Sequence, residues 1–171
     1  SNRSDGSVFE SSTGELFMDP GRKFLSVNTS RMQGVCMTDN KPVNLNELKI
    51  DKMSTAGCLA VVAMDGMKPL KHAGRIVLVY STQALNNEMS FTSRDMSRVV
   101  HYGNGQAVMA GGEILFSLKN SNASFLHLYA LDLSGKRHKE ILPVSVDTDS
   151  ISFRIHTVRD ALSPFFEINV R

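Results

Sequence analysis

The stretch that decides the fold spans residues 57–87 and reads GCLAVVAMDGMKPLKHAGRIVLVYSTQALNN. It contains two short apolar runs, residues 58–63 and 76–80, separated by a polar segment with a turn signal at Asp65-Gly66 and a rigid Pro69. Runs of this length are typical of strands and too short for most helices. The second run is apolar in both alternating sets of positions, which indicates a central strand covered on both faces.

The rest of the chain repeats this pattern of short apolar segments between turn residues. Two segments around Asp19-Pro20-Gly21 predict a β-hairpin, because Pro presets one turn position and Gly tolerates positive φ. Further strand-like segments lie at 34–37, 43–51, 99–100, 106–109, 113–118, 125–133, 140–146, 151–156 and 165–170. The sequence therefore predicts an all-β fold, an antiparallel β-sandwich of about ten to twelve short strands.

Two segments interrupt this pattern. Residues 85–98 are polar and lack periodicity, so we expect a long loop there, with a short helix around residues 93–96. A long loop in a compact domain is often functional or packed against another domain. A single helical turn is also expected at residues 159–163, before the last strand.

Length and composition indicate one domain without a strong electrostatic preference. The chain has 171 residues, 42% of them apolar and 21% charged, with a net charge of +2. We expect residues 13–171 to form a single β-sandwich domain and residues 1–12 to be a disordered segment; the Ser1-Asn2 start without Met suggests a tag remnant. The weak charge predicts no nucleic-acid partner. No apolar run approaches the roughly 20 residues that span a bilayer, so no membrane partner is expected.

The two cysteines, Cys36 and Cys58, lie 22 residues apart, each in or beside an apolar strand-like segment. Free thiols are common in such buried places, and this interpretation is favoured. A disulfide between the two cysteines remains the alternative, and the spacing does not decide between them.

A search for catalytic and metal-binding motifs finds none. The five histidines show no metal-ligand spacing, no serine lies in a nucleophile elbow, and the cysteines lack a recognisable motif with a histidine partner. Gly103-Asn104-Gly105 begins like a dinucleotide fingerprint but has Val108 in place of the third glycine, so we interpret it as a turn. Several aspartates lie at or beside turns: Asp65, Asp132, Asp147 and Asp149. We therefore expect no catalytic residue, no metal site and no cofactor.

Two surface features remain as binding candidates. The basic cluster at residues 136–139 follows a Ser-Gly turn and is best explained as a solvated hairpin tip rather than an anion site. Sugar-binding surfaces usually offer a planar aromatic ring with polar neighbours. The chain has no Trp, and Tyr102, in a glycine-rich turn, is the one reasonable candidate for carbohydrate binding. Tyr80 and Tyr129 are equally well explained as half-buried sheet residues.

Several motifs resemble those of a known domain. Residues 60–70 read AVVAMDGMKPL, residues 75–79 read RIVLV, residues 86–89 read NNEM, and weaker matches follow at 102–105 and 128–135. This order is similar to the C-terminal β-sandwich accessory domain of TIM-barrel glycoside hydrolases of the agarase and cellulase-like kind. The sequence departs from the family pattern at Met67, at residues 72–74 and at Glu88.

The resemblance implies a non-catalytic function. A domain of this kind would be a non-catalytic part of a larger glycoside hydrolase, packing on and stabilising the catalytic barrel, which carries the catalytic glutamates. The implied partner is the catalytic domain of the parent chain, and the implied location is extracellular or periplasmic. The alternative hypothesis is a carbohydrate-binding module that recognises a polysaccharide, and an independent small enzyme is the third.

Overall fold

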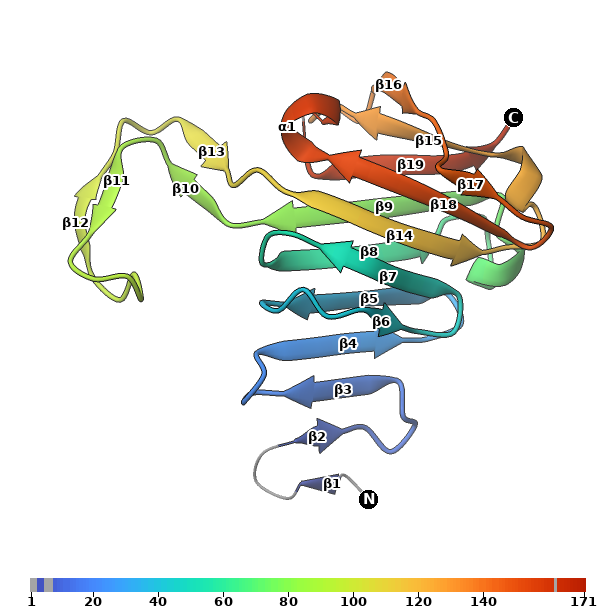
Figure 1. The fold of residues 1–171 in the computed structure, drawn as a ribbon, viewed down its shortest axis with the longest axis horizontal. Helices are drawn as coiled ribbons and strands as arrows, with labels where there is room; N and C mark the ends of the chain where they lie inside the picture. The colour runs from blue at the N-terminus through green and yellow to red at the C-terminus, as the bar shows by residue number, and fades with distance from the viewer. Residues whose placement is uncertain (1–2, 5–7, 162) are drawn as a thin grey trace.

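The computed structural model describes residues 3–4, 8–161 and 163–171, and it confirms the antiparallel all-β fold (Figure 1). The described residues form nineteen strands, more than the ten to twelve expected, and every strand pair among these residues is antiparallel. The excess comes from very short strands near the N-terminus, at residues 84–86 and 89–91, and at residues 43–44 and 145–146, where a predicted segment is divided in two. The helical part is small: α1 (Thr157–Asp160) and the 3₁₀ turns η1 (Leu70–His72) and η2 (Ala123–Phe125).

The larger sheet has ten strands and contains the stretch that decides the fold. Its spatial order is β1 (Arg3–Ser4), β2 (Phe9–Glu10), β3 (Leu16–Asp19), β4 (Phe24–Asn28), β5 (Met32–Met37), β8 (Gly57–Ala63), β9 (Arg75–Thr82), β19 (Phe165–Val170), β15 (Leu126–Leu131) and β16 (Arg137–Ile141). The predicted hairpin is present as β3 and β4. The two apolar runs are the neighbouring strands β8 and β9 at the middle of this sheet.

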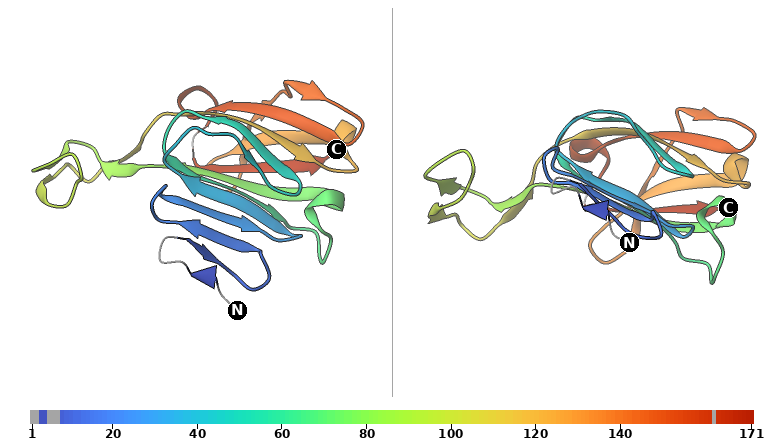
Figure 2. Two further views of the ribbon diagram at one scale, coloured as in Figure 1. Left: turned by 60° about the horizontal axis from the view of Figure 1, so that its bottom comes forward. Right: turned by 90° about the horizontal axis from the view of Figure 1, so that it is seen from below.

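The smaller sheet has five strands, in the order β17 (Ser145–Val146), β18 (Ser150–His156), β14 (Glu113–Lys119), β7 (Leu48–Met53) and β6 (Val43–Asn44). It lies over the central and C-terminal strands of the large sheet, while β1 to β3 extend beyond it (Figures 1 and 2). The two layers enclose one apolar core, in which Ile76 and Leu78 of β9 and Ile114 and Phe116 of β14 are fully buried.

Strand β9 corrects one expectation from the sequence. Its inward side chains, including Tyr80, are fully buried, but Val77 and Val79 on the other side are only half-buried. The strand is central within its sheet, as predicted, yet the described part of the chain forms no second layer over its outer face. The apolar residues on that face therefore need another explanation.

The predicted loop at residues 85–98 is correct only in part: residues 92–98 form no strand, whereas residues 84–86 and 89–91 do. Residues 84–109 form a projecting arm of two short ribbons, in which β10 (Ala84–Asn86) pairs with β13 (Ala107–Met109) and β11 (Met89–Phe91) pairs with β12 (Val99–Tyr102) (Figure 1). The expected helix at residues 93–96 is a turn, and the helical turn near the C-terminus begins two residues earlier than expected. The strand-like segments predicted at 99–100 and 106–109 correspond to β12 and β13, whereas β10 and β11 lie in the polar stretch without periodicity and escape a search for apolar runs.

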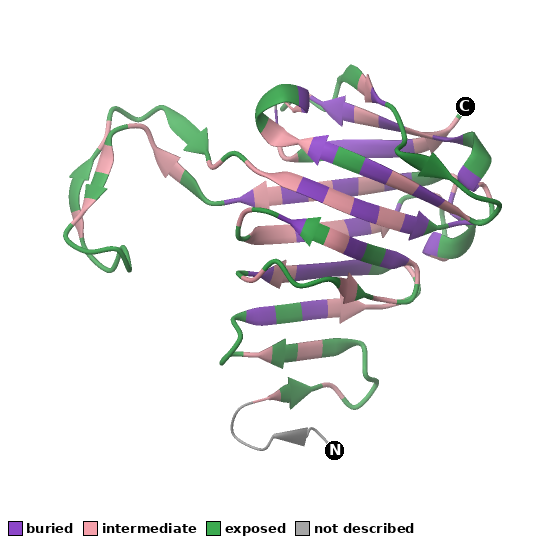
Figure 3. Cartoon of the chain, viewed as in Figure 1, coloured by how far each residue is buried: buried purple, intermediate pink, exposed green. Residues whose placement is uncertain are grey.

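The N-terminal segment lies at the edge of the large sheet. Residues 1–2 and 5–7, part of the segment expected to be disordered, lie outside the described residues. In its described part, β1 pairs with β2, and β2 pairs with β3. Figure 3 colours β2 and β3 mostly exposed, in contrast to the buried centre of the sandwich.

Two buried amides join the sheets at the end opposite the arm. The Gln33 side chain on β5 accepts hydrogen bonds from the backbone N–H groups of Glu47 and Leu48, at 2.9 and 2.8 Å. The Asn120 side chain, at the end of β14, donates to the carbonyls of Leu70 and Ala73 at 2.7 and 2.9 Å. Since buried polar groups must be paired, these bonds fix the sheets relative to each other.

Candidate interaction surface

The outer face of the large sheet carries two long apolar rows of side chains. In antiparallel sheets, residues directly opposite one another share a face, so the register identifies each row. The first row runs across six strands: Phe9, Met18, Leu25, Cys36, Cys58 and Ser81. The second row is Leu16, Val27, Gly34, Ala60, Val79 and Phe165. We call these two rows the apolar face.

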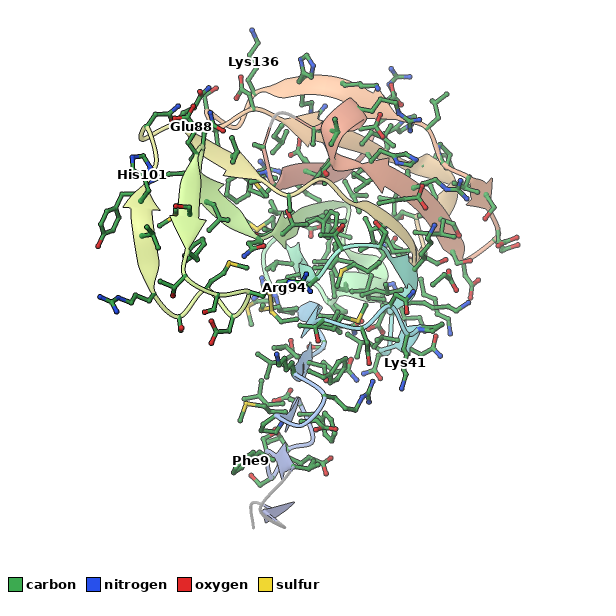
Figure 4. The ribbon with its side chains drawn as sticks, turned by 60° about the vertical axis from the view of Figure 1, so that its left-hand side comes forward. Phe9, Lys41, Glu88, Arg94, His101 and Lys136 are labelled. Carbon is green, nitrogen blue, oxygen red and sulfur yellow. A yellow bond between two sulfur atoms is a disulfide. The ribbon has the colours of Figure 1, made fainter. Side chains whose placement is uncertain are left out.

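Many members of the apolar face are exposed in this chain. Leu16 is 49% exposed, and Phe9, Met18, Leu25 and Phe165 lie between 37% and 42%. Figure 4 shows Phe9 far out on the N-terminal strands, away from the sandwich. Single exposed apolar residues are ordinary, but a contiguous patch over neighbouring strands marks a contact surface.

The middle of the apolar face is shallow because Gly34 and Ala60 lie opposite each other there. A Cβ atom added to Gly34 would lie 2.6 Å from the Leu59 carbonyl oxygen and 2.9 Å from the Ala60 Cβ. No larger residue fits at position 34 without moving backbone. The apolar face therefore has large side chains at its ends and little bulk at its centre.

A disulfide between Cys36 and Cys58 lies within the first row and overturns the thiol interpretation. The two residues are direct partners on β5 and β8, and their Cα atoms are 4.0 Å apart. Sequence spacing could not show this, because strand register alone decides whether two cysteines in neighbouring strands meet.

Beyond the apolar rows, the C-terminal part of this face is polar. Glu167 on β19 accepts hydrogen bonds from Arg75 at 2.8 Å and from Arg137 at 2.7 Å. Arg137 also lies over the Tyr129 ring, 4.3 Å from its centre, and His127 stacks against the same ring. Both neighbours restrict access to the Tyr129 ring, which makes it a poor platform for a sugar.

The two most buried carboxylates have structural partners. Burial alone would raise the pKa of Glu167, but its hydrogen bonds with Arg75 and Arg137 outweigh this effect and hold the pKa below its ordinary value. Asp160 follows the same pattern: burial opposes ionisation, and bonds from Arg159, Lys139 and a backbone N–H hold its pKa well below its usual range. A general acid needs the opposite shift, so neither group is suited to that task.

The outer face of the small sheet contrasts with the apolar face. Its cross-strand rows pair Lys52 with Leu115 and Arg154, and Lys49 with Ser117 and Ser152. Glu113 forms ion pairs with Lys52 at 2.8 Å and with His156 at 2.9 Å. This surface carries charges and hydroxyl groups, as expected for a sheet that faces water.

The arm presents Tyr102, the candidate for carbohydrate binding from the sequence. Tyr102 is 72% exposed, and its carbonyl accepts a hydrogen bond from the Asn86 side chain at 3.0 Å. The next residue, Gly103, has a φ of +77°, and a Cβ there would lie 2.1 Å from the Asn87 carbonyl oxygen. The turn that holds Tyr102 thus requires glycine, while its ring projects into solvent. Figure 4 shows the neighbouring His101 and Glu88 on the same arm.

Asp132 and the basic cluster, both considered from the sequence, lie at the turn between β15 and β16. Asp132 accepts bonds from the backbone N–H groups of Ser134 and Lys136, which is the turn role expected for it. The basic cluster lies on the tip and first residues of β16. Within the described ranges, no group of three or more His, Cys, Asp or Glu residues could hold a metal ion. In the same part of the chain, no helix has the length and apolar character required to span a membrane.

Comparisons of this chain with protein-family models, curated proteins and solved structures find no match. The similarity to glycoside hydrolase accessory domains therefore remains a prediction from the quoted motifs.

Proposed function

We propose that this chain is a non-catalytic β-sandwich accessory domain of a larger glycoside hydrolase, and that its apolar face packs on the catalytic barrel. The observation that carries this proposal is the apolar face itself. Two rows that cross six strands each expose apolar side chains on one sheet, while the outer face of the other sheet is charged. In the parent protein, the barrel would cover this surface and gain stability from its burial.

The disulfide supports the compartment that this role implies. Disulfides persist in oxidising environments such as the extracellular space and the periplasm. The Cys36–Cys58 bond therefore agrees with a secreted polysaccharide-degrading enzyme. It also ties together the two strands at the centre of the proposed contact, so the surface stays in register.

A pair of matched leucine substitutions tests the proposal in the full parent chain. Leu25→Glu places a charge in the apolar face, whereas Leu115→Glu places the same charge on the small sheet between Lys52 and Arg154. We expect Leu25→Glu to weaken the domain contact by about 30-fold or more, in the range of an interface hot spot, and to lower the thermal midpoint of the barrel. Leu115→Glu should leave both unchanged.

Deletion of residues 13–171 provides the broader test. We expect the catalytic domain without them to unfold at a lower temperature, because its covered flank becomes exposed. An unchanged midpoint together with unchanged activity would contradict the stabilising role, as would a native open reading frame that encodes no second domain.

Tyr102 supports a second candidate function, recognition of a polysaccharide. An exposed ring on a fixed turn can stack on the face of a sugar. Affinity electrophoresis of this chain in gels that contain agarose, cellulose or xylan would reveal retardation. If Tyr102 is the platform, Tyr102→Ala removes the retardation and Tyr129→Ala does not. Unretarded migration in every gel would remove this candidate.

A further inference from the structure

A cavity lies at the root of the arm, where three separate parts of the chain meet. It has a volume of about 430 Å³, within the range of roughly 300–1,000 Å³ typical of ligand sites. One wall comes from the arm and includes Ala84, Ala107 and Met109. The opposite side includes Leu133, from the turn between β15 and β16, and Val158, from α1.

The chemistry of this cavity selects an uncharged apolar occupant. Its described lining contains no Lys, Arg, Asp, Glu or His side chain, and most of its residues are Ala, Gly, Met, Leu, Val or Pro. A sugar would lose the hydration of its hydroxyl groups there without finding enough partners. At the rim, Leu133 is 80% exposed and Val158 is 86% exposed, so large apolar groups face solvent in this chain.

The cavity adjoins the apolar face. Pro164 lines the cavity, and the next residue, Phe165, belongs to the second apolar row, opposite Val79. A partner that covers Phe165 therefore reaches the mouth of the cavity. The surface proposed for the contact thus continues around the end of the sheet and under the arm.

Among the described residues, the hydrogen bonds that join the arm to the sandwich lie at its root. There, the Thr82 hydroxyl donates to the Ala110 carbonyl at 2.6 Å, and the Ala110 N–H donates to the Gln83 carbonyl at 2.8 Å. Two-stranded ribbons are marginally stable on their own in water. Figures 1 and 2 show the arm extending away from both layers, in a position to lie against a second body.

From these observations, we infer that an apolar side chain of the partner domain fills the cavity at the root of the arm, so that the arm clamps the partner. This inference rests on the proposed function, because it assigns the occupant to the same catalytic domain that covers the apolar face. The occupant is an aliphatic or aromatic side chain, and the arm closes over the segment that presents it.

Amide hydrogen exchange in the full parent chain tests the clamp. We expect the amides of residues 107–111 to exchange at least about ten-fold more slowly there than in residues 1–171 alone. Ala107→Trp, at an exposed position, would fill the cavity from within and remove this protection. Ala84→Trp should act in the same way from the facing strand. Ala56→Trp is the matched control, since Ala56 is exposed and does not line the cavity.

The outcomes separate the clamp from the docking surface. If Leu25→Glu releases the partner but Ala107→Trp and Ala84→Trp leave the protection of residues 107–111 intact, the clamp is wrong and the proposed function stands. If Leu25→Glu has no effect on the contact, the proposed function fails. Equal exchange in the parent and in this chain overturns the clamp. Protection that rises with the concentration of this chain alone also overturns it, because a second copy would then be the occupant.

Discussion

The outer faces of the two sheets obey the same alternation but present opposite chemistry. On the small sheet, the outward positions of β14 hold Glu113, Leu115, Ser117 and Lys119, three of which are polar. On the large sheet, the outward positions of β4 and β9 include Leu25, Val27, Val77 and Val79, which are exposed or half-buried, and the described residues form no further layer over them. The alternation of side chains along a strand separates inward from outward positions. Only the residue types at the outward positions indicate whether that face meets water. This difference is the reason for proposing that a partner covers the large sheet rather than the small one.

The largest expected effect comes from the covalent link within the apolar face. Replacing both Cys36 and Cys58 with Ala should lower the free energy of unfolding by about 2–4 kcal/mol, because the unfolded chain gains the freedom that a closed loop denies it. The small sheet offers a matched cross-strand pair, Ser117 and Ser152, joined by a hydrogen bond of 2.9 Å. Replacing both serines with Ala should cost about 1 kcal/mol or less.

Urea unfolding of both double variants measures this difference. Treatment of the wild-type chain with a reductant should reproduce the loss seen for the cysteine variant. Equal midpoints for wild type and the cysteine variant would show that the link adds no stability, and the contrast between the faces would then rest on surface chemistry alone.

A smaller effect should separate the charged groups of the two faces. Glu167→Gln should destabilise the chain by about 1–2 kcal/mol, because Arg75 and Arg137 lose a charged acceptor whose side chain is only 10% exposed. Glu113→Gln, on the small sheet, should leave the urea midpoint unchanged because water screens its ion pairs.

The pH dependence of stability provides a second test of the role of Glu167. Since folding lowers the pKa of Glu167, its stabilisation is present above the ordinary pKa of a glutamate and is lost as the pH falls below it. From roughly pH 6 down to pH 3, the free energy of unfolding of the wild-type chain should therefore fall more steeply than that of Glu167→Gln. Parallel pH profiles would contradict the assignment of Glu167 as a buried partner of the two arginines.

The smallest expected effect concerns the apolar side chains themselves. Leu25→Lys should change the free energy of unfolding of this chain by no more than about 0.5 kcal/mol, because an exposed side chain loses little on substitution. It should nevertheless reduce self-association, measured by light scattering, since it interrupts the apolar face. Leu115→Lys should change neither quantity. A loss above about 2 kcal/mol for Leu25→Lys would place that residue in the core and weaken the comparison.

The sequence predicted the framework of this fold better than its contact surfaces. The runs around Leu59 and Leu78 indicated central strands, since alternation and length are properties of the local chain. Strands β10 and β11 of the arm, around Leu85 and Met89, escaped prediction because they are short and carry no continuous apolar pattern, whereas the segments that form β12 and β13 were predicted. The apolar face escaped prediction because hydrophobic periodicity does not tell whether a residue such as Val79 would be covered by the chain itself or by a partner. The disulfide and the buried amide of Asn120 depend on strand register and on distant contacts, which no local pattern records.

The arm is also the connection by which the chain passes from one layer to the other. It leaves β9 in the large sheet and returns as β14 in the small sheet, so both of its ends continue directly into central strands. A load applied to its tip by a bound neighbour would therefore be shared between the two layers rather than peeling an edge strand away. Because both ends of the arm continue into central strands, force on the arm would not separate the strands of the sandwich.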